Sequence, residues 1–280
     1  MMNKFLFFDI DGTLTDSDHG IQWPSESTLA AIRKAQAAGS RCLICSGRNL
    51  GGLKQYLALN MDGYIFSDGG GIYFPGQEPI LEPIPDDLVR WLIHDVTVNR
   101  HGEMILAAVD RMYCSPQEYE FMTEFTGQIA AAENVSLAEM LERMGIRHLA
   151  DYNGEPVMES DVGFACQADE DAFMRDLPEE LEFVSTTASY GRGERTSGEV
   201  TKRGVNKGAG IQKAVRLMNG SMEDTYGFGD SMNDASMLAV CNTGIAMGNG
   251  AQELKDLADY VTGDIQEDGL ADAMRHFGLI

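Results

Sequence analysis

Residues 4–12 read KFLFFDIDG, and this stretch decides the fold class. After Lys4 the run is entirely apolar until Asp9, which is typical of a strand that is covered on both of its faces. Such strands occur in parallel sheets. The run ends in acidic residues and Gly12, so we expect a buried parallel strand whose carboxyl end carries Asp9 and Asp11.

The segments that follow alternate between helical and strand patterns. This order predicts an α/β fold with a Rossmann-like parallel sheet, helices on both faces, and ligands bound at the carboxyl ends of the strands. The predicted elements are a helix over Ser25–Ala38 that stops at Gly39, a strand at RCLIC (41–45), a helix carrying Leu50, Leu53 and Leu57, and a strand at GYIF (63–66).

Four prolines between residues 75 and 85 indicate a domain boundary, which we place near residue 83. The middle section mixes strand-like runs, MILAAV (104–109) and VGFAC (162–166), with the helical stretch EYEFMTEF (118–125). We therefore predict a core formed by 1–82 and 188–280 and an inserted α+β domain over 83–187. The glycine-rich and charged segment 189–204 is interpreted as a solvated loop without a chemical role.

The chain of 280 residues is strongly acidic, with 44 Asp and Glu against 21 Lys and Arg and a formal charge of −23. Such a field repels nucleic acid and anionic membrane surfaces, so neither is an expected partner. It also repels a phosphorylated substrate. An anion site in this chain must obtain positive charge locally, from a metal ion, a lysine or a helix N-terminus.

Cysteine usage and hydropathy both favour a cytoplasmic protein. No apolar run is long enough for a signal peptide or a membrane span. Five cysteines, an odd number, indicate reduced thiols rather than a disulfide framework. Cys42 and Cys45 lie in the predicted strand 41–45, where their odd separation directs them to opposite faces, so we expect two buried thiols.

Two acidic groups stand where predicted strands end. Asp9 and Asp11 project to the same side in extended geometry, and Asp230 ends the run TYGF in GDSMND, four residues before Asp234. Several carboxylates together need a cation, and Mg²⁺ prefers such oxygen ligands. The alternatives are that DIDG is a polar strand exit and that the second group caps a helix.

Two further segments suit a phosphate group. Ser46 and Gly47 follow the strand 41–45 and offer a hydroxyl and backbone N–H groups, although SGR also reads as an ordinary turn. Lys207 stands at the predicted start of a helix, where a cation is unusual unless an anion lies beside it. The alternative for Lys207 is a surface lysine next to a helix start.

Four motifs in chain order, DIDGTL, ICSGR, NKGAG and GFGDSMND, resemble the haloacid dehalogenase superfamily of phosphotransferases. The chain is most similar to the Cof-like branch, whose members carry a large α/β cap inserted between the second and third motifs. The tail TGIAMGNGAQELKDLADYVTGDIQEDG is also similar to that branch. The resemblance covers about the first 75 and the last 80 residues, and it extends to the middle by position and length.

The resemblance implies a set of roles. Asp9 is the nucleophile that takes the phosphoryl group, and Asp11 protonates the leaving alcohol and later activates water. Mg²⁺ is held by Asp9, the backbone carbonyl of Asp11, and Asp230, with Asp234 supporting the site from outside the metal's direct contacts. The phosphate oxygens are held by Lys207, Ser46, the Gly47 N–H and Asn233, with Arg48 as a further candidate.

The expected activity is hydrolysis of a small phosphomonoester, with sugar phosphates first, because enzymes with this cap often accept them. An acid at position 11 favours hydrolysis or mutase chemistry. The rival interpretations are a phosphomutase and a non-catalytic phosphate sensor, and the oligomeric state is left open. One departure from the branch is Asp68, where an asparagine is usual, so the substrate contact there is not carried over.

Overall fold

The computed structural model describes residues 4–186 and 194–280, which form two compact units. The first comprises Met1–Gly47, Gln55–Ile80 and Val205–Ile280, and the second comprises Arg48–Lys54 and Leu81–Gly204. Each unit has its own sheet. The α/β class predicted from the sequence is confirmed.

The first unit is built on an eight-stranded sheet in the order β14-β13-β12-β1-β2-β3-β4-β5. The pairings from β14 to β3 are parallel, whereas β4 pairs antiparallel with β3. The strands are β1 (Phe5–Phe8), β2 (Arg41–Cys45), β3 (Gly63–Phe66), β4 (Gly71–Tyr73), β5 (Ile80–Leu81), β12 (Thr225–Gly229), β13 (Thr243–Ala246) and β14 (Tyr260–Val261). As KFLFF predicts, β1 is buried along its whole length between β2 and β12.

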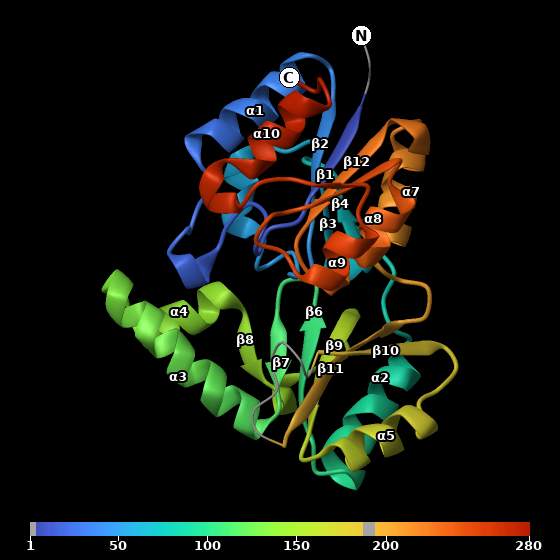
Figure 1. The fold of residues 1–280 in the computed structure, drawn as a ribbon. Helices are drawn as coiled ribbons and strands as arrows, with labels where there is room; N and C mark the ends of the chain where they lie inside the picture. Colours follow the sequence, from blue (N-terminus) through green and yellow to red (C-terminus); the bar gives the residue numbers. More distant parts are fainter. Residues whose placement is uncertain (1–3, 187–193) are drawn as a thin grey trace. The chain divides into compact units, whose positions relative to one another are not determined.

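Helices cover both faces of this sheet (Figure 1). One face carries α1 (Glu26–Ala37) and α10 (Gly269–His276), and the other carries α7 (Lys207–Leu217) and α8 (Ala235–Val240); α9 (Gln252–Leu257) follows β13. The two strand cysteines lie on opposite faces as expected, because Cys42 Sγ contacts Ile32 O of α1 and Cys45 Sγ contacts Lys207 O of α7.

Local capping explains where α1 and α7 begin. Ser25 Oγ accepts from the N–H of Thr28 at the start of α1, and Asn206 Oδ1 accepts from the N–H of Ala209 at the start of α7. These contacts satisfy N–H groups that have no partner inside the helix. The cap at Asn206 makes Lys207 the first residue of α7, so its side chain starts from the carboxyl edge of the sheet.

One predicted helix is wrong. The pattern Leu50, Leu53 and Leu57 predicts an α-helix, but the structure has only a 3₁₀ turn over Lys54–Leu59. The boundary between the two units also falls inside this turn, after Lys54. Two glycines, Gly51 and Gly52, precede it, and glycine disfavours an α-helix.

The second unit contains a six-stranded sheet in the order β10-β11-β9-β6-β7-β8. All its pairings are antiparallel except β7 with β8. Its strands are β6 (Glu103–Ala108), β7 (Met112–Cys114), β8 (Ile146–His148), β9 (Val157–Phe164), β10 (Leu181–Ser185) and β11 (Thr196–Lys202); its helices are α2 (Asp86–Ile93), α3 (Pro116–Glu133), α4 (Leu137–Met144) and α5 (Gln167–Asp176).

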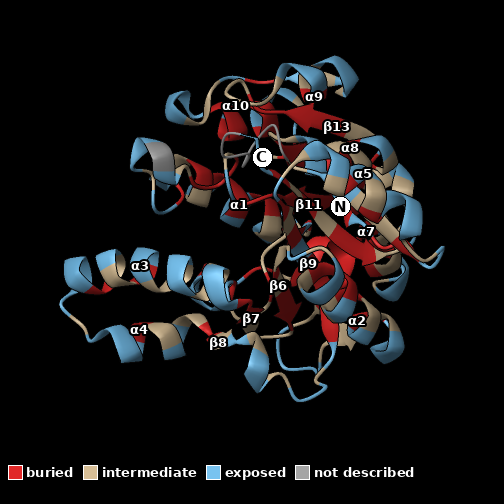
Figure 2. Ribbon diagram, turned by 90° about the horizontal axis from the view of Figure 1, so that it is seen from below, coloured by how far each residue is buried: buried red, intermediate tan, exposed pale blue. Residues whose placement is uncertain are grey.

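The helices of the second unit differ in burial. Residues of α2 and α5, including Leu92 and Phe173, enter an apolar cluster with Leu106 and Phe164 of the sheet. By contrast, α3 and α4 pair with one another and are exposed over much of their surface (Figure 2). This mixed architecture agrees with the α+β character predicted for the middle of the chain.

The predicted return to the first unit at residue 188 is wrong. The structure returns at Val205, because β11 pairs with both β9 and β10 and therefore belongs to the second sheet. The predicted solvated loop over 189–204 is accordingly a strand between Thr196 and Lys202. Part of that predicted loop, 189–193, lies outside the described residues. The predicted start of the insertion, residue 83, lies close to Leu81.

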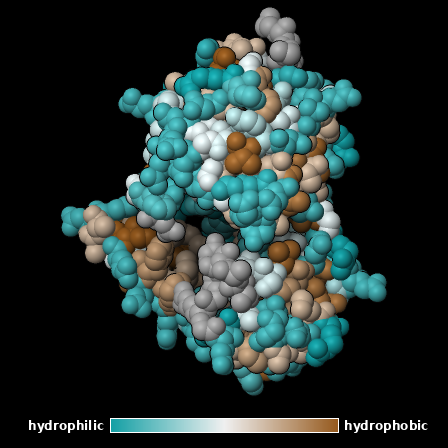
Figure 3. All heavy atoms as spheres, in the orientation of Figure 1, coloured by the Kyte–Doolittle hydropathy of each residue, from teal (hydrophilic) through white to brown (hydrophobic). Residues whose placement is uncertain are grey.

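With 44 acidic and 21 basic residues, the chain should expose a largely hydrophilic surface. Hydrophilic side chains predominate on the face drawn in Figure 3, and hydrophobic ones are scattered among them. Within the described residues, no helix combines the length and the apolar composition that a bilayer crossing demands.

Candidate active site

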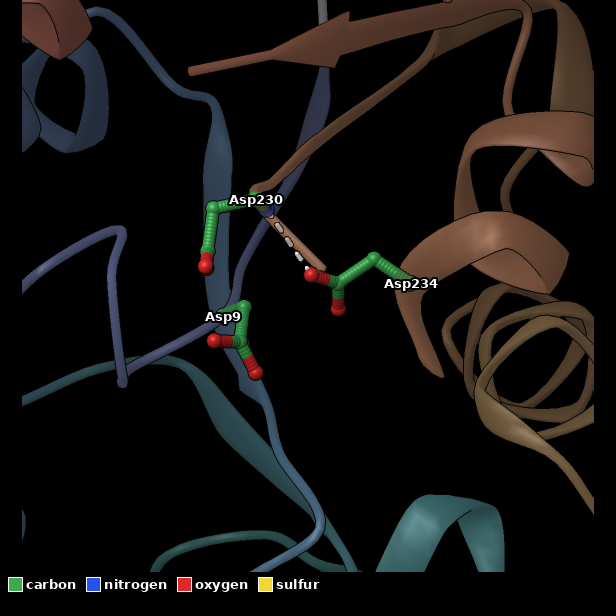
Figure 4. A group of neighbouring side chains, drawn as sticks. All are labelled: Asp9, Asp230 and Asp234. Carbon is green, nitrogen blue, oxygen red and sulfur yellow. Dashed lines mark hydrogen bonds between the residues drawn. The ribbon is translucent and has the colours of Figure 1, made fainter. Parts of the chain in front are cut away.

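Three carboxylates meet at the carboxyl edge of the first sheet (Figure 4). Asp9 follows β1 and Asp230 follows β12, and these neighbouring parallel strands are in register at Phe8 and Phe228. Asp234 comes from the turn that leads into α8. Each of the three acids offers an oxygen within 4.8 Å of the others. The fold therefore brings together acids that are more than two hundred residues apart in sequence.

Lys207 is fully buried and pairs with two of these three acids. Its Nζ donates to Asp9 Oδ1 at 2.7 Å and to Asp234 Oδ1 at 2.6 Å. Asp68 Oδ1 is 3.9 Å from the same nitrogen. The interpretation of Lys207 as a surface lysine is wrong, since one ammonium group bridges two buried carboxylates.

Asp234 supports the other members of the site with both of its oxygens. Oδ1 accepts from Lys207, while Oδ2 accepts from the N–H groups of Asp230 and Ser231 at 2.9 and 3.2 Å. The turn is also closed by a capping box between Ser231 and Asp234. Asp234 therefore caps the turn, as the alternative interpretation of GDSMND proposed, and at the same time orients Lys207 and Asp230.

The loop after Asp9 carries the second acid of the first motif. Asp11 is exposed, and its side chain is not one of the three converging carboxylates. Thr13 Oγ1 donates to Asp230 Oδ1 at 3.1 Å, which links this loop to the end of β12. No pattern in the sequence indicates a role for Thr13, because a threonine after a glycine turn carries no distinctive signal.

Gly12 allows the loop to pass close to Asp230. It adopts a φ of +89°, and a β-carbon added to it would lie 2.1 Å from Asp230 Oδ2. We expect Gly12→Ala to displace the Asp230 carboxylate and to lower the phosphate-ester hydrolysis that the four motifs predict by about 10²-fold, because small misplacements of reacting groups have effects of this order. Steady-state kinetics measures this. Gly20→Ala, also at positive φ but with nothing near its added carbon, is the control, and equal losses in both variants would contradict the assignment to Asp230.

The residues predicted to hold phosphate lie in several places. Ser46 is buried at the end of β2, and its carbonyl accepts from the N–H of Asp68. A β-carbon on Gly47 would lie 3.2 Å from Asp68 Oδ2, so the turn after β2 passes beside Asp68. Asn233 is exposed, with its Oδ1 accepting from Ser231 Oγ. Arg48 belongs to the second unit, and its predicted contact with phosphate stays a prediction.

The electrostatics of the site show an excess of negative charge. Burial, followed by repulsion from Asp234, raises the pKa of Asp9 well above its ordinary value. The same two causes raise the pKa of Asp230 to about 7. Burial opposes the charge of Lys207, but Asp234 and Asp9 together raise its pKa well above the ordinary lysine value. One buried ammonium therefore does not balance the surrounding carboxylates.

A divalent cation fits this donor set. The converging ligand atoms are carboxylate oxygens, which hard ions such as Mg²⁺ prefer, and no cysteine or histidine is in the group. A cation favours the charged form of a carboxylate, so it would reverse the raised pKa values of Asp9 and Asp230. The cluster and its charge therefore suit a divalent cation, while the ligand set of Asp9, Asp11 and Asp230 stays a prediction.

Comparison with known proteins gives the family. The model of the haloacid dehalogenase-like hydrolases matches residues 6–274. The Bacillus subtilis protein named "Putative phosphatase YkrA" is 30% identical over the full length of both chains. The 5-amino-6-(5-phospho-D-ribitylamino)uracil phosphatase YcsE of the same organism is 25% identical over 99% of this chain and 96% of its own.

Solved structures agree with the sequence comparisons. The subclass IIB sugar phosphatase BT4131 of this superfamily superposes with a TM-score of 0.75 at 28% identity, covering 99% of this chain and all of its own. The resemblance drawn from the four motifs is thereby confirmed. The chain belongs to the haloacid dehalogenase-like hydrolases and is a phosphatase of that family.

Proposed function

We propose that this phosphatase is a Mg²⁺-dependent phosphomonoester hydrolase that acts through an aspartyl-phosphate on Asp9. The observation that carries the proposal is the buried Lys207, which joins Asp9 to Asp234, while Asp230 places a carboxylate oxygen within 4.8 Å of both acids. A structural ion pair needs only one carboxylate. A cluster of three carboxylates, two of them bonded to one ammonium, is a charge arrangement that a cation and a phosphoryl group would complete.

The reaction divides into two displacements at phosphorus. First, Asp9 forms a bond to phosphorus as the ester P–O bond breaks, and Asp11 gives its proton to the departing alkoxide oxygen. Water then attacks phosphorus, Asp11 takes its proton, and inorganic phosphate leaves as the Asp9 carboxylate is regenerated. Asp11 is suited to this double role because it is exposed and lies two residues from Asp9.

The metal would be held by the Asp9 and Asp230 carboxylates and the backbone carbonyl of Asp11, with Asp234 orienting its neighbours. When bound, Mg²⁺ supplies positive charge that offsets repulsion between the Asp9 carboxylate and the incoming phosphate. Lys207, Ser46, the Gly47 N–H and Asn233 would hold the phosphoryl oxygens. Positioning and charge stabilisation of this kind are the main contributions of a protein to phosphoryl transfer.

Binding of Mg²⁺ should be linked to pH through Asp230. Because its pKa is raised to about 7, the metal-free site retains a proton there at lower pH, and Mg²⁺ must displace it. We expect the affinity for Mg²⁺ to fall as the pH is lowered through about 7, with protons released on binding. Titration calorimetry in buffers of different ionisation enthalpy measures both, and binding without proton release below neutral pH would contradict this linkage.

The substrate we infer is a small phosphorylated metabolite, a sugar phosphate first. Support comes from the neighbour described as a sugar phosphatase and from the relative named for a phosphoribityl compound. We assign substrate selection to the inserted second unit. We also infer a cytoplasmic location, since the cysteines are free and four of the five are buried.

Release of inorganic phosphate from a panel of sugar phosphates, nucleotides and aryl phosphates, with Mg²⁺ and with chelator, tests the proposal. We expect metal-dependent release that is greatest for a sugar phosphate. Transfer of the phosphoryl group to a second sugar hydroxyl, without release, would identify a phosphomutase instead. Binding of phosphate without turnover of any ester would identify a sensor.

A further inference from the structure

The turn after β13 reads MGNG and lies against the main chain around Asp230. The N–H of Met247 donates to Gly229 O at 2.9 Å, and the N–H of Ala251 donates to Asp230 O at 2.8 Å. The turn is thus bonded to the main chain at Asp230 and at the residue before it. Any side chain of this turn that reaches the Asp9 loop therefore connects the two sides of the proposed metal site.

Asn249 is the residue that makes this connection. Its Nδ2 donates to Gly12 O at 2.7 Å, and its Oδ1 accepts from the N–H of Ile265 at 3.0 Å. Both ends of the amide are engaged, so its orientation is fixed by a donor on one side and an acceptor on the other. Asn249 thereby joins the loop after β1 to the turn that precedes α10.

The packing of the turn leaves little room for adjustment. A β-carbon on Gly250 would lie 2.7 Å from Asp230 O, and one on Gly248 would lie 2.6 Å from Asp264 N. The main chain can approach this closely only because both residues are glycines. The position of the Asn249 side chain is therefore set by the backbone that carries it.

The Gly12–Thr13 peptide is consequently held from two directions. Asn249 bonds the Gly12 carbonyl, and Thr13 Oγ1 bonds the Asp230 carboxylate. The first contact reaches Asp230 through the main chain of the turn, and the second reaches it directly. Without these two hydrogen bonds, repulsion between the Asp9 and Asp230 carboxylates would tend to move the loop after Asp9 away from Asp230.

We propose that Asn249 is a positioning residue for Mg²⁺: it fixes the separation between the Asp9–Gly12 loop and Asp230, and so sets the affinity of the site for the metal. This inference rests on the proposed function. Asn249 acts through the Gly12 carbonyl and does not itself touch the metal. Mutation of a partner that orients metal ligands in this way typically lowers metal affinity by about 10- to 100-fold. We expect an effect of the same size for Asn249.

The test is titration calorimetry of Mg²⁺ into the metal-free full-length protein, comparing wild type with Asn249→Ala. We expect the Kd for Mg²⁺ to rise by about 10- to 100-fold. In kinetics at saturating Mg²⁺, we expect KM for an aryl phosphate to change much less, because the phosphate contacts are separate from Asn249. A Kd for Asn249→Ala equal to that of wild type would overturn the inference.

Two control variants separate positioning from general loosening of the turn. Lys255→Met removes the bond from Nζ to Gly248 O at 2.6 Å, which holds the same turn but does not reach Gly12. Asn242→Ala removes an exposed amide on the preceding loop. We expect both to bind Mg²⁺ like wild type. If Lys255→Met weakened binding as much as Asn249→Ala, the specific role of Asn249 would be refuted.

If Asn249→Ala does not stay folded at the assay temperature, Asn249→Asp replaces it. A carboxylate can still accept from Ile265 but cannot donate to the Gly12 carbonyl. Its added negative charge alone would strengthen Mg²⁺ binding, so weaker binding supports the inference and equal or tighter binding overturns it. Failure of the wild type to bind Mg²⁺ would instead contradict the proposed function.

Discussion

Replacement of Asp9 by Asn is expected to lower the turnover of an aryl phosphate by about 10⁴-fold or more, because removal of a covalent nucleophile has effects of this order. The amide has nearly the same shape as the carboxylate but is a far poorer nucleophile towards phosphorus. Lys207 keeps its bond to Asp234 in this variant, so the fold should persist. Phosphate release measured at saturating Mg²⁺, together with a thermal melt, gives both quantities.

The matched control for this variant is Asp224→Asn. Asp224 is a carboxylate of the same unit that pairs with Lys4 near the start of β12, away from the acidic cluster. Its replacement should leave turnover close to that of wild type. Turnover by Asp9→Asn at a rate near that of the control would remove Asp9 as the nucleophile.

Replacement of Lys207 by Met is expected to reduce both stability and activity. The change leaves the Asp9 and Asp234 carboxylates buried without their common partner, and breaking a buried ion pair from one side costs about 3–5 kcal/mol. Activity should fall by about 10³-fold, as for loss of a donor that stabilises a transition state. Urea denaturation without metal, with steady-state kinetics, measures the two effects.

The stability loss should also depend on pH. Without the ammonium, the folded-state pKa of the Asp9 carboxyl group rises further above its unfolded value. The folded protein then binds protons more readily than the unfolded chain, so its stability falls as the pH rises through that pKa. Lys207→Met should accordingly be less impaired at about pH 5 than at about pH 8. Lys34→Met, an exposed lysine of α1, is the control, and equal free energies of unfolding in both variants would contradict the role of Lys207.

The core of the fold was predictable from local patterns. Continuous apolar runs such as Phe5–Phe8 indicate a buried parallel strand, and Ser25 and Gly39 delimit the first helix as capping rules require. The return from the insertion was not predictable. In residues 196–202, TSGEVTK, polar and charged residues predominate, and only pairing with β9 and β10 makes this segment a strand.

The acidic members of the site were also predictable, since Asp9 and Asp230 directly follow strands and Asp234 lies four residues after Asp230. The burial of Lys207 and the contacts between residues far apart in the sequence were not predictable. The local sequence around Lys207 favours a surface position, because lysine is rarely buried. Its burial depends on the packing of α7 against β3 and α8. The roles of Thr13 and Asn249 come from side-chain contacts across more than two hundred residues of sequence, which no local pattern encodes.

The most direct test of the central claim is a crystal structure of the protein with Mg²⁺ and beryllium fluoride, a mimic of a bound phosphoryl group. The account predicts one metal ion bound by the carboxylates of Asp9 and Asp230, with beryllium bonded to the other oxygen of Asp9 and Lys207 beside its fluorines. Beryllium fluoride attached to a different residue, or a metal bound away from Asp9 and Asp230, would contradict it.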